Sequence, residues 1–141
     1  MRGRVIIAAT ALGALVVAGC SGRTTASGGA SKTCVATIGM EDAFTGPLAL
    51  SGHEDLGFAQ LALAMDNKAN HTKISMVHGD TQLNPAQATT VTQQLISNPK
   101  MVAVVGPGGS QEAEAVGPLM TGAGMAFVSG SATATALTTG K

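Results

Sequence analysis

A short apolar segment that stops at a glycine-rich turn constrains the fold of this chain more than any other feature. Residues 102–105 are Val-Ala-Val-Val, and Gly106-Pro-Gly-Gly follows directly. Ser110 stands where the N-cap of a helix belongs, and Glu112 and Glu114 fall in the first turn, where acidic side chains favour a helix start. The segment therefore predicts a buried strand, a turn that a ligand can approach closely, and a helix start whose free amides favour an anion.

The same strand-then-helix order is repeated along the chain. Further strands are predicted over residues 35–39, 74–77 and 125–128. Helices are expected around residues 54–67, from an N-cap at Asn84 to residue 98, and over residues 110–122, the last kinked or shortened at Gly117-Pro118. Connections of this length make neighbouring strands parallel. The predicted fold class is therefore α/β, a Rossmann-like parallel sheet flanked by helices.

Three loops rich in glycine and hydroxyl side chains should meet at one edge of this sheet. They cover residues 41–51, 106–110 and 129–133. In an open α/β sheet, ligands bind beyond the carboxyl ends of the strands. Because these loops offer amides and hydroxyls but few groups for acid–base chemistry, the sequence predicts a binding crevice rather than a catalytic site.

The sequence does not match the motifs of common enzymes, because each motif lacks a required residue here. Gln111 interrupts the dinucleotide pattern G-x-G-x-x-G, and no lysine completes a phosphate-binding loop. A nucleophile elbow could centre on Ser110, but Glu112 occupies its last glycine position. Glu41 and Asp42 are adjacent, would point apart at a strand end, and are interpreted as solvated loop charges. We therefore expect no enzyme and no catalytic residue.

The remaining ionisable residues indicate neither a metal nor a cofactor. No cysteine and histidine spacing fits a metal site. His53 is the histidine that could approach a ligand, whereas His71 and His78 are interpreted as solvated and as a strand-edge residue. Cys34 is either a small buried residue at the first strand or the partner of a cysteine beyond this sequence. Eight basic and eight acidic side chains give no net charge, so nucleic acid is not an expected partner.

The first 20 residues have the order of a secretory signal peptide. Arg2 and Arg4 precede an apolar run over residues 5–17, which is shorter than the roughly 20 residues of a spanning helix. The run of small residues that follows ends on Cys20 and resembles a bacterial lipobox, which implies a secreted lipoprotein anchored through Cys20 to the outer face of the cytoplasmic membrane. A retained membrane anchor and an unmodified Cys20 thiol are the alternatives. The expected organisation is a signal peptide over residues 1–20, a flexible tether over 21–33 and a folded lobe over 34–141.

Several short pieces occur together in the order and spacing of one family. They are Phe44-Thr-Gly-Pro-Leu48, Asp80 with Asn84-Pro85 and Ala88, Val105-Gly106 with Ser110, and Val128-Ser-Gly-Ser131-Ala-Thr133 with Leu137-Thr138. With these pieces the chain resembles the type I periplasmic binding proteins, most closely the branched-chain amino acid (Leu/Ile/Val) receptors of ABC transporters. Members of that family have two lobes that close on a ligand between them. The resemblance implies that this chain is most of the N-terminal lobe.

The resemblance also implies roles for individual residues. Ser110 would bind the α-carboxylate of the ligand through its hydroxyl and amide, while the Ser131 carbonyl and the Thr133 hydroxyl would hold the α-ammonium group. In a purely structural role, Ser110 would be an N-cap and Thr133 a turn residue. Ser51 stands where the family often has an aromatic residue, and Gly109 where some members have a cysteine. The ligand therefore stays open among aliphatic amino acids, amides, urea and other small polar solutes.

The sequence stops at Lys141, soon after the fourth predicted strand, and is interpreted as an N-terminal fragment. The complete receptor would deliver its ligand to ABC permease subunits. A ligand-sensing domain of the same fold, a truncated lipoprotein that binds nothing and a surface enzyme are the competing interpretations. We expect the fragment alone to bind ligand weakly, because closure of the cleft requires both lobes.

Overall fold

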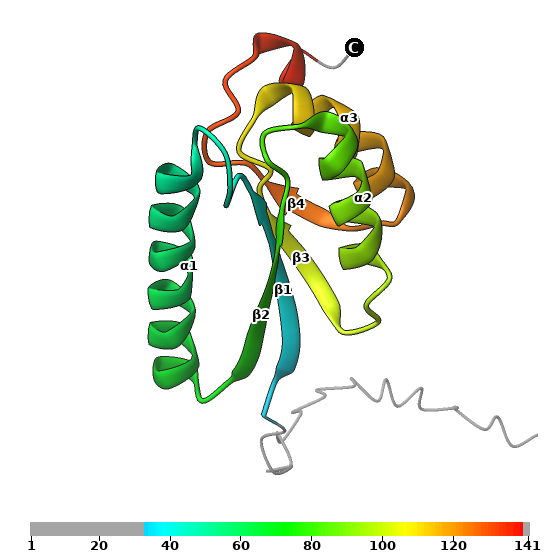
Figure 1. Ribbon diagram of the computed structural model, residues 1–141. Helices are drawn as coiled ribbons and strands as arrows, with labels where there is room; N and C mark the ends of the chain where they lie inside the picture. The colour runs from blue at the N-terminus through cyan, green and yellow to red at the C-terminus, as the bar shows by residue number, and fades with distance from the viewer. Residues whose placement is uncertain (1–32, 140–141) are drawn as a thin grey trace, which may run out of the picture. The chain divides into compact units, whose positions relative to one another are not determined.

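The computed structural model describes residues 33–139 (Figure 1). The predicted signal peptide, the lipobox Cys20 and nearly all of the predicted tether lie outside these residues. Within the described part of the chain, no helix combines the length and the apolar character needed to cross a membrane.

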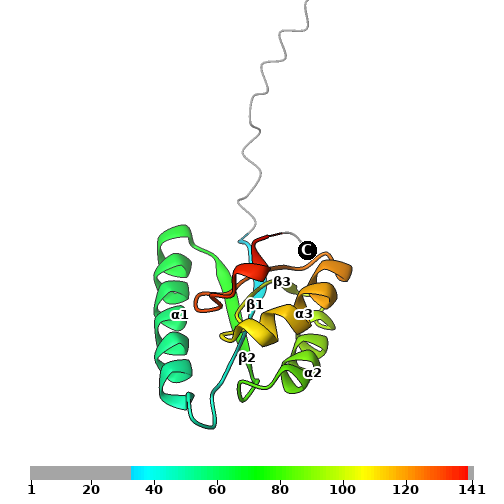
Figure 2. The same cartoon turned by 90° about the horizontal axis from the view of Figure 1, so that it is seen from above.

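Strands and helices alternate as the sequence predicts. The elements are β1 (Val35–Asp42), α1 (Ala49–Asn70), β2 (Lys73–Asp80), α2 (Pro85–Ile96), β3 (Met101–Val105), α3 (Ser110–Gly122), β4 (Ala126–Val128) and a final 3-10 turn (Thr135–Leu137). The strands form one sheet in the order β2-β1-β3-β4, and every neighbouring pair is parallel. Viewed from above, α1 covers one face of the sheet, and α2 and α3 cover the other (Figure 2). The predicted α/β fold class is confirmed.

Strand β1 is longer than predicted, and this changes the position of two acidic residues. It pairs with β2 over its whole length, from Val35 opposite Lys73 to Asp42 opposite Asp80. Glu41 and Asp42 therefore belong to the strand rather than to the following loop. Because successive side chains of a strand point to opposite faces, the two carboxyl groups point apart.

Helix α1 also differs from the prediction, because it begins at Ala49 and so includes Ser51. The reason is a tertiary contact that the sequence pattern does not show. A Cβ atom on Gly52 would lie 2.2 Å from the carbonyl oxygen of Ala43, so only glycine lets the first turns of α1 pack this closely against the end of β1. Ser51 is thereby held on a helix instead of a loop.

The starts of α2 and α3 use different caps. Asn84 is the N-cap of α2, as predicted, and its side chain accepts hydrogen bonds from the amides of Ala86 and Gln87. The prediction that Ser110 is an N-cap is wrong, because Gly109 caps α3 and Ser110 is the first helical residue. The helix also continues through Pro118 to Gly122 and is not shortened there.

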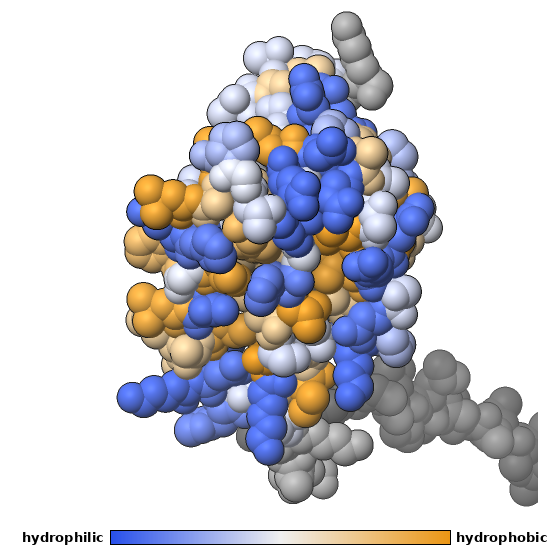
Figure 3. Space-filling view, viewed as in Figure 1, coloured by the Kyte–Doolittle hydropathy of each residue, from blue (hydrophilic) through white to orange (hydrophobic). Residues whose placement is uncertain are grey.

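The main hydrophobic core lies between the sheet and the α2/α3 layer. It consists of Ala88, Val91, Leu95, Met101, Val104, Val116 and Met120. A smaller cluster of Met40, Phe44 and Leu56 lies under α1. The predicted covering of α1 by neighbours is not seen in the described residues, since Leu50, Phe58 and Met65 are exposed, and apolar side chains are visible on the α1 side of the surface in Figure 3.

Candidate functional site

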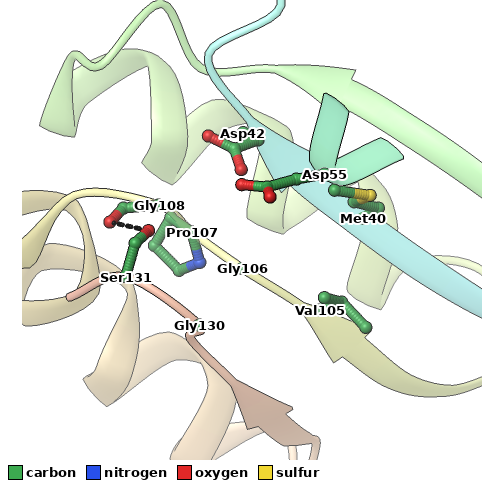
Figure 4. A pocket seen from close by; sticks show the side chains of 9 residues that line it. All are labelled: Met40, Asp42, Asp55, Val105, Gly106, Pro107, Gly108, Gly130 and Ser131. Carbon is green, nitrogen blue, oxygen red and sulfur yellow. Dashed lines mark hydrogen bonds between the residues drawn. The ribbon is translucent and has the colours of Figure 1, made fainter. Parts of the chain in front are cut away.

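The turn after β3 and the segment after β4 are joined by polar contacts at the carboxyl edge of the sheet. The amide of Gly106 donates to the carbonyl of Val128 at 2.7 Å. The Ser129 hydroxyl donates to the carbonyl of Pro107 at 2.6 Å, and the Ser131 hydroxyl donates to the carbonyl of Gly108 at 2.8 Å (Figure 4). Two of the three predicted loops are thus held in direct contact.

Ser110 adds a further link between the same two segments. Its Oγ atom accepts hydrogen bonds from the amides of Thr133 at 3.0 Å and Ala134 at 3.1 Å. A serine hydroxyl has two acceptor sites and one proton. With both acceptor sites used by amides, the hydroxyl proton of Ser110 remains to be donated, and an anion is the partner that this proton favours.

Two adjacent cavities open beside this junction. One, of about 230 Å³, is lined by Asp42, Leu48, Ser51, Asp55, Leu83, Gly108, Gly109, Ser110 and Ser131. The other, of about 250 Å³, is lined by Met40, Asp42, Asp55, Val105, Gly106, Pro107, Gly108, Gly130 and Ser131 (Figure 4). Three of the predicted site residues therefore share one cavity. Thr133 does not line either cavity, and its backbone amide contacts Ser110 instead.

The glycines of the turn allow an unusually close approach between β3 and β1. Gly106 has φ +104°, and a Cβ atom there would lie 1.9 Å from the carbonyl oxygen of Glu41. A Cβ atom on Gly108 would lie 2.5 Å from Oδ1 of Asp42. A side chain at position 106 would displace the backbone at the end of β1, and one at position 108 would displace the Asp42 carboxylate, so the turn is fixed beside the cavities by shape as well as by hydrogen bonds.

Two aspartates that the sequence analysis did not place in the site line both cavities. Figure 4 shows Asp42 and Asp55 side by side, across from Pro107 and Gly108. Burial raises the pKa of the half-buried Asp42, the amide of Ala43 lowers it, and the negative charge of Asp55 raises it. The interpretation of Asp42 as a solvated loop charge is therefore wrong. The extension of β1 to Asp42, which decides where this side chain points, has no signal in the local sequence.

Glu41 is not a solvated charge either. It is completely buried, and the hydroxyl of Thr92 on α2 donates to its Oε2 atom at 2.7 Å. Burial raises the pKa of Glu41 to about 7, against the lowering effect of the Thr92 hydrogen bond and with a further rise from the charge of Glu112. Glu41 lies on the α2/α3 side of the sheet, away from the cavities.

The histidines and Cys34 lie outside the two cavities. His53 lines a different hollow on α1, together with Phe58 and Leu61, and its ring centroid lies 5.8 Å from that of Phe44. His78 also packs edge-on against Phe44, with ring centroids 5.3 Å apart. Cys34 is an exposed free thiol, so the first of its two interpretations, a small buried residue, is wrong. Residues 33–139 hold no cluster of three or more acidic, histidine or cysteine residues that fits a metal ion.

Asp80 fixes the loop between β1 and α1. Its Oδ1 atom accepts hydrogen bonds from the amides of Phe44 at 2.8 Å, Thr45 at 3.2 Å and Gln82 at 3.1 Å. Burial raises the pKa of Asp80, but the hydrogen bonds from the Thr45 side chain and from these amides outweigh that effect and lower it below its ordinary value. The ionised carboxylate of Asp80 thus holds the loop that leads into Ser51.

An open parallel sheet with cavities beyond its strand ends, lined in part by hydroxyl and carboxylate side chains, is typical of an α/β ligand-binding lobe. Residues 35–141 match the family model described as periplasmic binding protein, and the chain belongs to that family. Its fold is that of one lobe of the type I proteins. No curated protein sequence matches the chain significantly.

Solved structures of substrate-binding proteins share the fold. The branched-chain amino acid substrate-binding protein LivJ of Streptococcus pneumoniae, in complex with isoleucine, is 36% identical over 77% of this chain and 32% of its own, with a TM-score of 0.69. A solute-binding protein of an ABC transporter from R. palustris, in complex with 4-hydroxybenzoate, is 27% identical over 74% of this chain and 29% of its own, with a TM-score of 0.65. The leucine-binding protein LivK of Thermotoga maritima, 20% identical with a TM-score of 0.68 over 75% of this chain and 30% of its own, shares the fold. This chain spans about a third of the length of these proteins.

We expect Asp80→Asn to lower the melting temperature of the full-length protein at pH 7. An amide in place of the carboxylate weakens the acceptor and puts an NH2 group beside backbone donors. Because the pKa of Asp80 is lowered in the folded state, its stabilising effect is present above the ordinary aspartate value and is lost as the pH falls through the lowered one.

The gap in melting temperature between wild type and Asp80→Asn should therefore narrow below about pH 4. Asp66→Asn is the matched control, because Asp66 is an α1 carboxylate whose hydrogen bonds come from the side chains of Asn70 and Thr72. A gap for Asp80→Asn no larger than the control's at pH 7, or one that does not change with pH, would contradict the assigned role.

Proposed function

We propose that the chain is the N-terminal lobe of an ABC transporter substrate-binding protein that binds an amino acid of the branched-chain type. The observation that carries this proposal is the convergence of Ser51, Ser110 and Ser131 with the Gly108-Gly109 turn on one cavity. Membership of the periplasmic binding protein family and the likeness to an isoleucine complex support it.

The start of α3 suits the carboxylate of such a ligand. The first amides of a helix have no partner within the helix and carry a partial positive charge. The Ser110 hydroxyl, whose acceptor sites are filled by the amides of Thr133 and Ala134, has its proton free to donate. We assign the carboxylate to this point, and the α-ammonium group to the Ser131 carbonyl and the Thr133 hydroxyl.

The charge around the cavities favours a ligand with an ammonium group over a simple anion. Asp42 and Asp55 line both cavities. The cationic side chains of the described residues, Lys68, Lys73 and Lys100, belong to the last turn of α1 and to the starts of β2 and β3, at the opposite edge of the sheet. A carboxylate pair without a nearby cation attracts the ammonium group of a zwitterion and repels an aromatic monoacid such as 4-hydroxybenzoate.

We further infer that the protein is secreted and held at the outer face of the cytoplasmic membrane through Cys20, and that it delivers its ligand to ABC permease subunits. The lipobox-like end of the apolar N-terminal segment supports the anchor. The family likeness supports the transport role over a ligand-sensing domain or a lipoprotein that binds nothing.

Calorimetry on the full-length protein tests the ligand class. We expect isoleucine, leucine or valine to bind and 4-hydroxybenzoate to give no measurable heat under the same conditions, because Asp42 and Asp55 disfavour an uncompensated anion. The variant Asp42→Asn should weaken amino-acid binding relative to wild type. Selective binding of 4-hydroxybenzoate, or binding of neither class, would rule out the amino-acid receptor.

Replacing Ser110 with alanine separates ligand binding from the stability of the junction. Ser110→Ala should weaken amino-acid binding by about 1–3 kcal/mol, the range for a hydrogen bond to a charged group. Ser129→Ala is the matched control: Ser129 also makes two hydrogen bonds at this junction, to Pro107 and from Ala132, but it lines neither cavity. If the two variants lose equal affinity, Ser110 acts only on the local structure.

A further inference from the structure

Helix α1 carries a row of exposed side chains along one side. We call Glu54, Phe58, Leu61, Met65 and Lys68 the α1 stripe. Their spacing alternates between four and three residues, which keeps all five on one side of a helix. Phe58 is 72% exposed, Leu61 57% and Met65 64% in the described chain, and Figure 3 shows apolar side chains on the α1 side of the surface. Single exposed apolar residues are ordinary, but a continuous apolar stripe between charged ends is typical of a surface that another protein covers.

The α1 stripe is not the side of the helix that packs on the sheet. The buried residues of α1 are Gly52 and Leu56, and Ala59 packs against the cluster under the helix. Phe58 lies two residues beyond Leu56, and Leu61 two beyond Ala59, which is about 200° around the helix in each case. The fold of this lobe therefore does not require apolar side chains at the stripe. Burial against a partner accounts for them.

We propose that the α1 stripe pairs with the same stripe of a second copy of this chain, the two helices running antiparallel about a two-fold axis beside Leu61. Seven residues separate Leu61 from Glu54 on one side and from Lys68 on the other. Antiparallel pairing therefore places each Glu54 opposite the Lys68 of the second copy. Phe58 and Met65 also lie at nearly equal distances from Leu61, so each ring meets the thioether of the second copy, a favourable contact.

The charges at the two ends of the stripe select this partner and this orientation. A parallel pair would place Glu54 beside Glu54 and Lys68 beside Lys68, and like charges in contact oppose association. The antiparallel pair replaces both repulsions with attractions and is self-complementary, as a two-fold interface must be. With one acidic and one basic residue, the stripe has no net positive charge to hold an anionic lipid surface.

The size of the stripe predicts weak association. Fourteen residues separate Glu54 from Lys68, a helix length of about 21 Å. A single helix pair of this length buries less surface than a standard protein interface, so we expect a dissociation constant in the roughly micromolar to millimolar range. Asp55, which lines the cavities, lies about 100° around α1 from Glu54. The dimer therefore does not depend on the proposed ligand, and its failure would leave the proposed function untouched.

Sedimentation equilibrium on the full-length protein, produced without a lipid anchor, tests the dimer at concentrations up to about 1 mM. We expect a monomer–dimer equilibrium in the wild type and a monomer for Phe58→Glu, which puts a charge at the centre of the contact. Gln60→Glu is the matched control, because it adds the same charge to an exposed position of α1 outside the stripe and should dimerise like wild type. A wild type that stays monomeric, because the rest of the full-length chain covers the stripe or because it binds phosphatidylcholine vesicles instead, would overturn the proposal.

Charge reversal tests the orientation and does not depend on Phe58→Glu being folded. Glu54→Lys and Lys68→Glu change exposed residues, and each should raise the dissociation constant about tenfold or more, because two attractions become two repulsions. The double variant Glu54→Lys/Lys68→Glu should return to within a few-fold of wild type. Single reversals without effect, or a double variant no better than either single one, would contradict the antiparallel pair.

Discussion

The close approach of the Gly106-Pro-Gly-Gly turn to the end of β1 is the constraint on which the site depends. Glycine at position 106 lets the turn lie against the Glu41 carbonyl, and glycine at position 108 lets it lie against the Asp42 carboxylate. Hydrogen bonds then join the turn to the end of β4 and the segment after it: the Gly106 amide donates to β4, and two serine hydroxyls of the segment donate to carbonyls of the turn. Backbone amides, hydroxyls and carboxylates are thereby gathered at one edge of the sheet, the kind of convergent polar groups that small-ligand sites use.

The two faces of the sheet contribute differently to this arrangement. The α2/α3 layer holds the main core and positions α3, whose first turn carries Ser110. The α1 face has a smaller cluster and exposed apolar side chains, but it supplies Ser51 and Asp55 from one helix to the cavity wall. The site therefore depends on contacts between layers, such as Gly52 against Ala43, as much as on the loops themselves. The chain spans about a third of the length of its solved relatives.

The fold could be predicted well from the sequence because the signals that mark strands and helix starts lie within a few neighbouring residues. Apolar runs between turn residues marked the strands, and Asn84-Pro85 marked the start of α2. The rule that loops after parallel strands share one edge correctly brought Ser110 and Ser131 together. The sequence did not predict the burial of Glu41, the position of Asp42 in the cavity wall or the helical position of Ser51. These depend on how far β1 pairs with β2 and how closely α1 packs on it, which are properties of distant contacts.

The central claim is that Ser110 and the free amides at the start of α3 receive the ligand carboxylate. Backbone amide shifts of the 15N-labelled full-length protein, recorded during titration with isoleucine, test it most directly. The account predicts saturable changes at Gly108 and Ser110, with little change at Lys100 and Met101 at the other end of β3. Saturable binding that leaves the amides of the turn unchanged would contradict it.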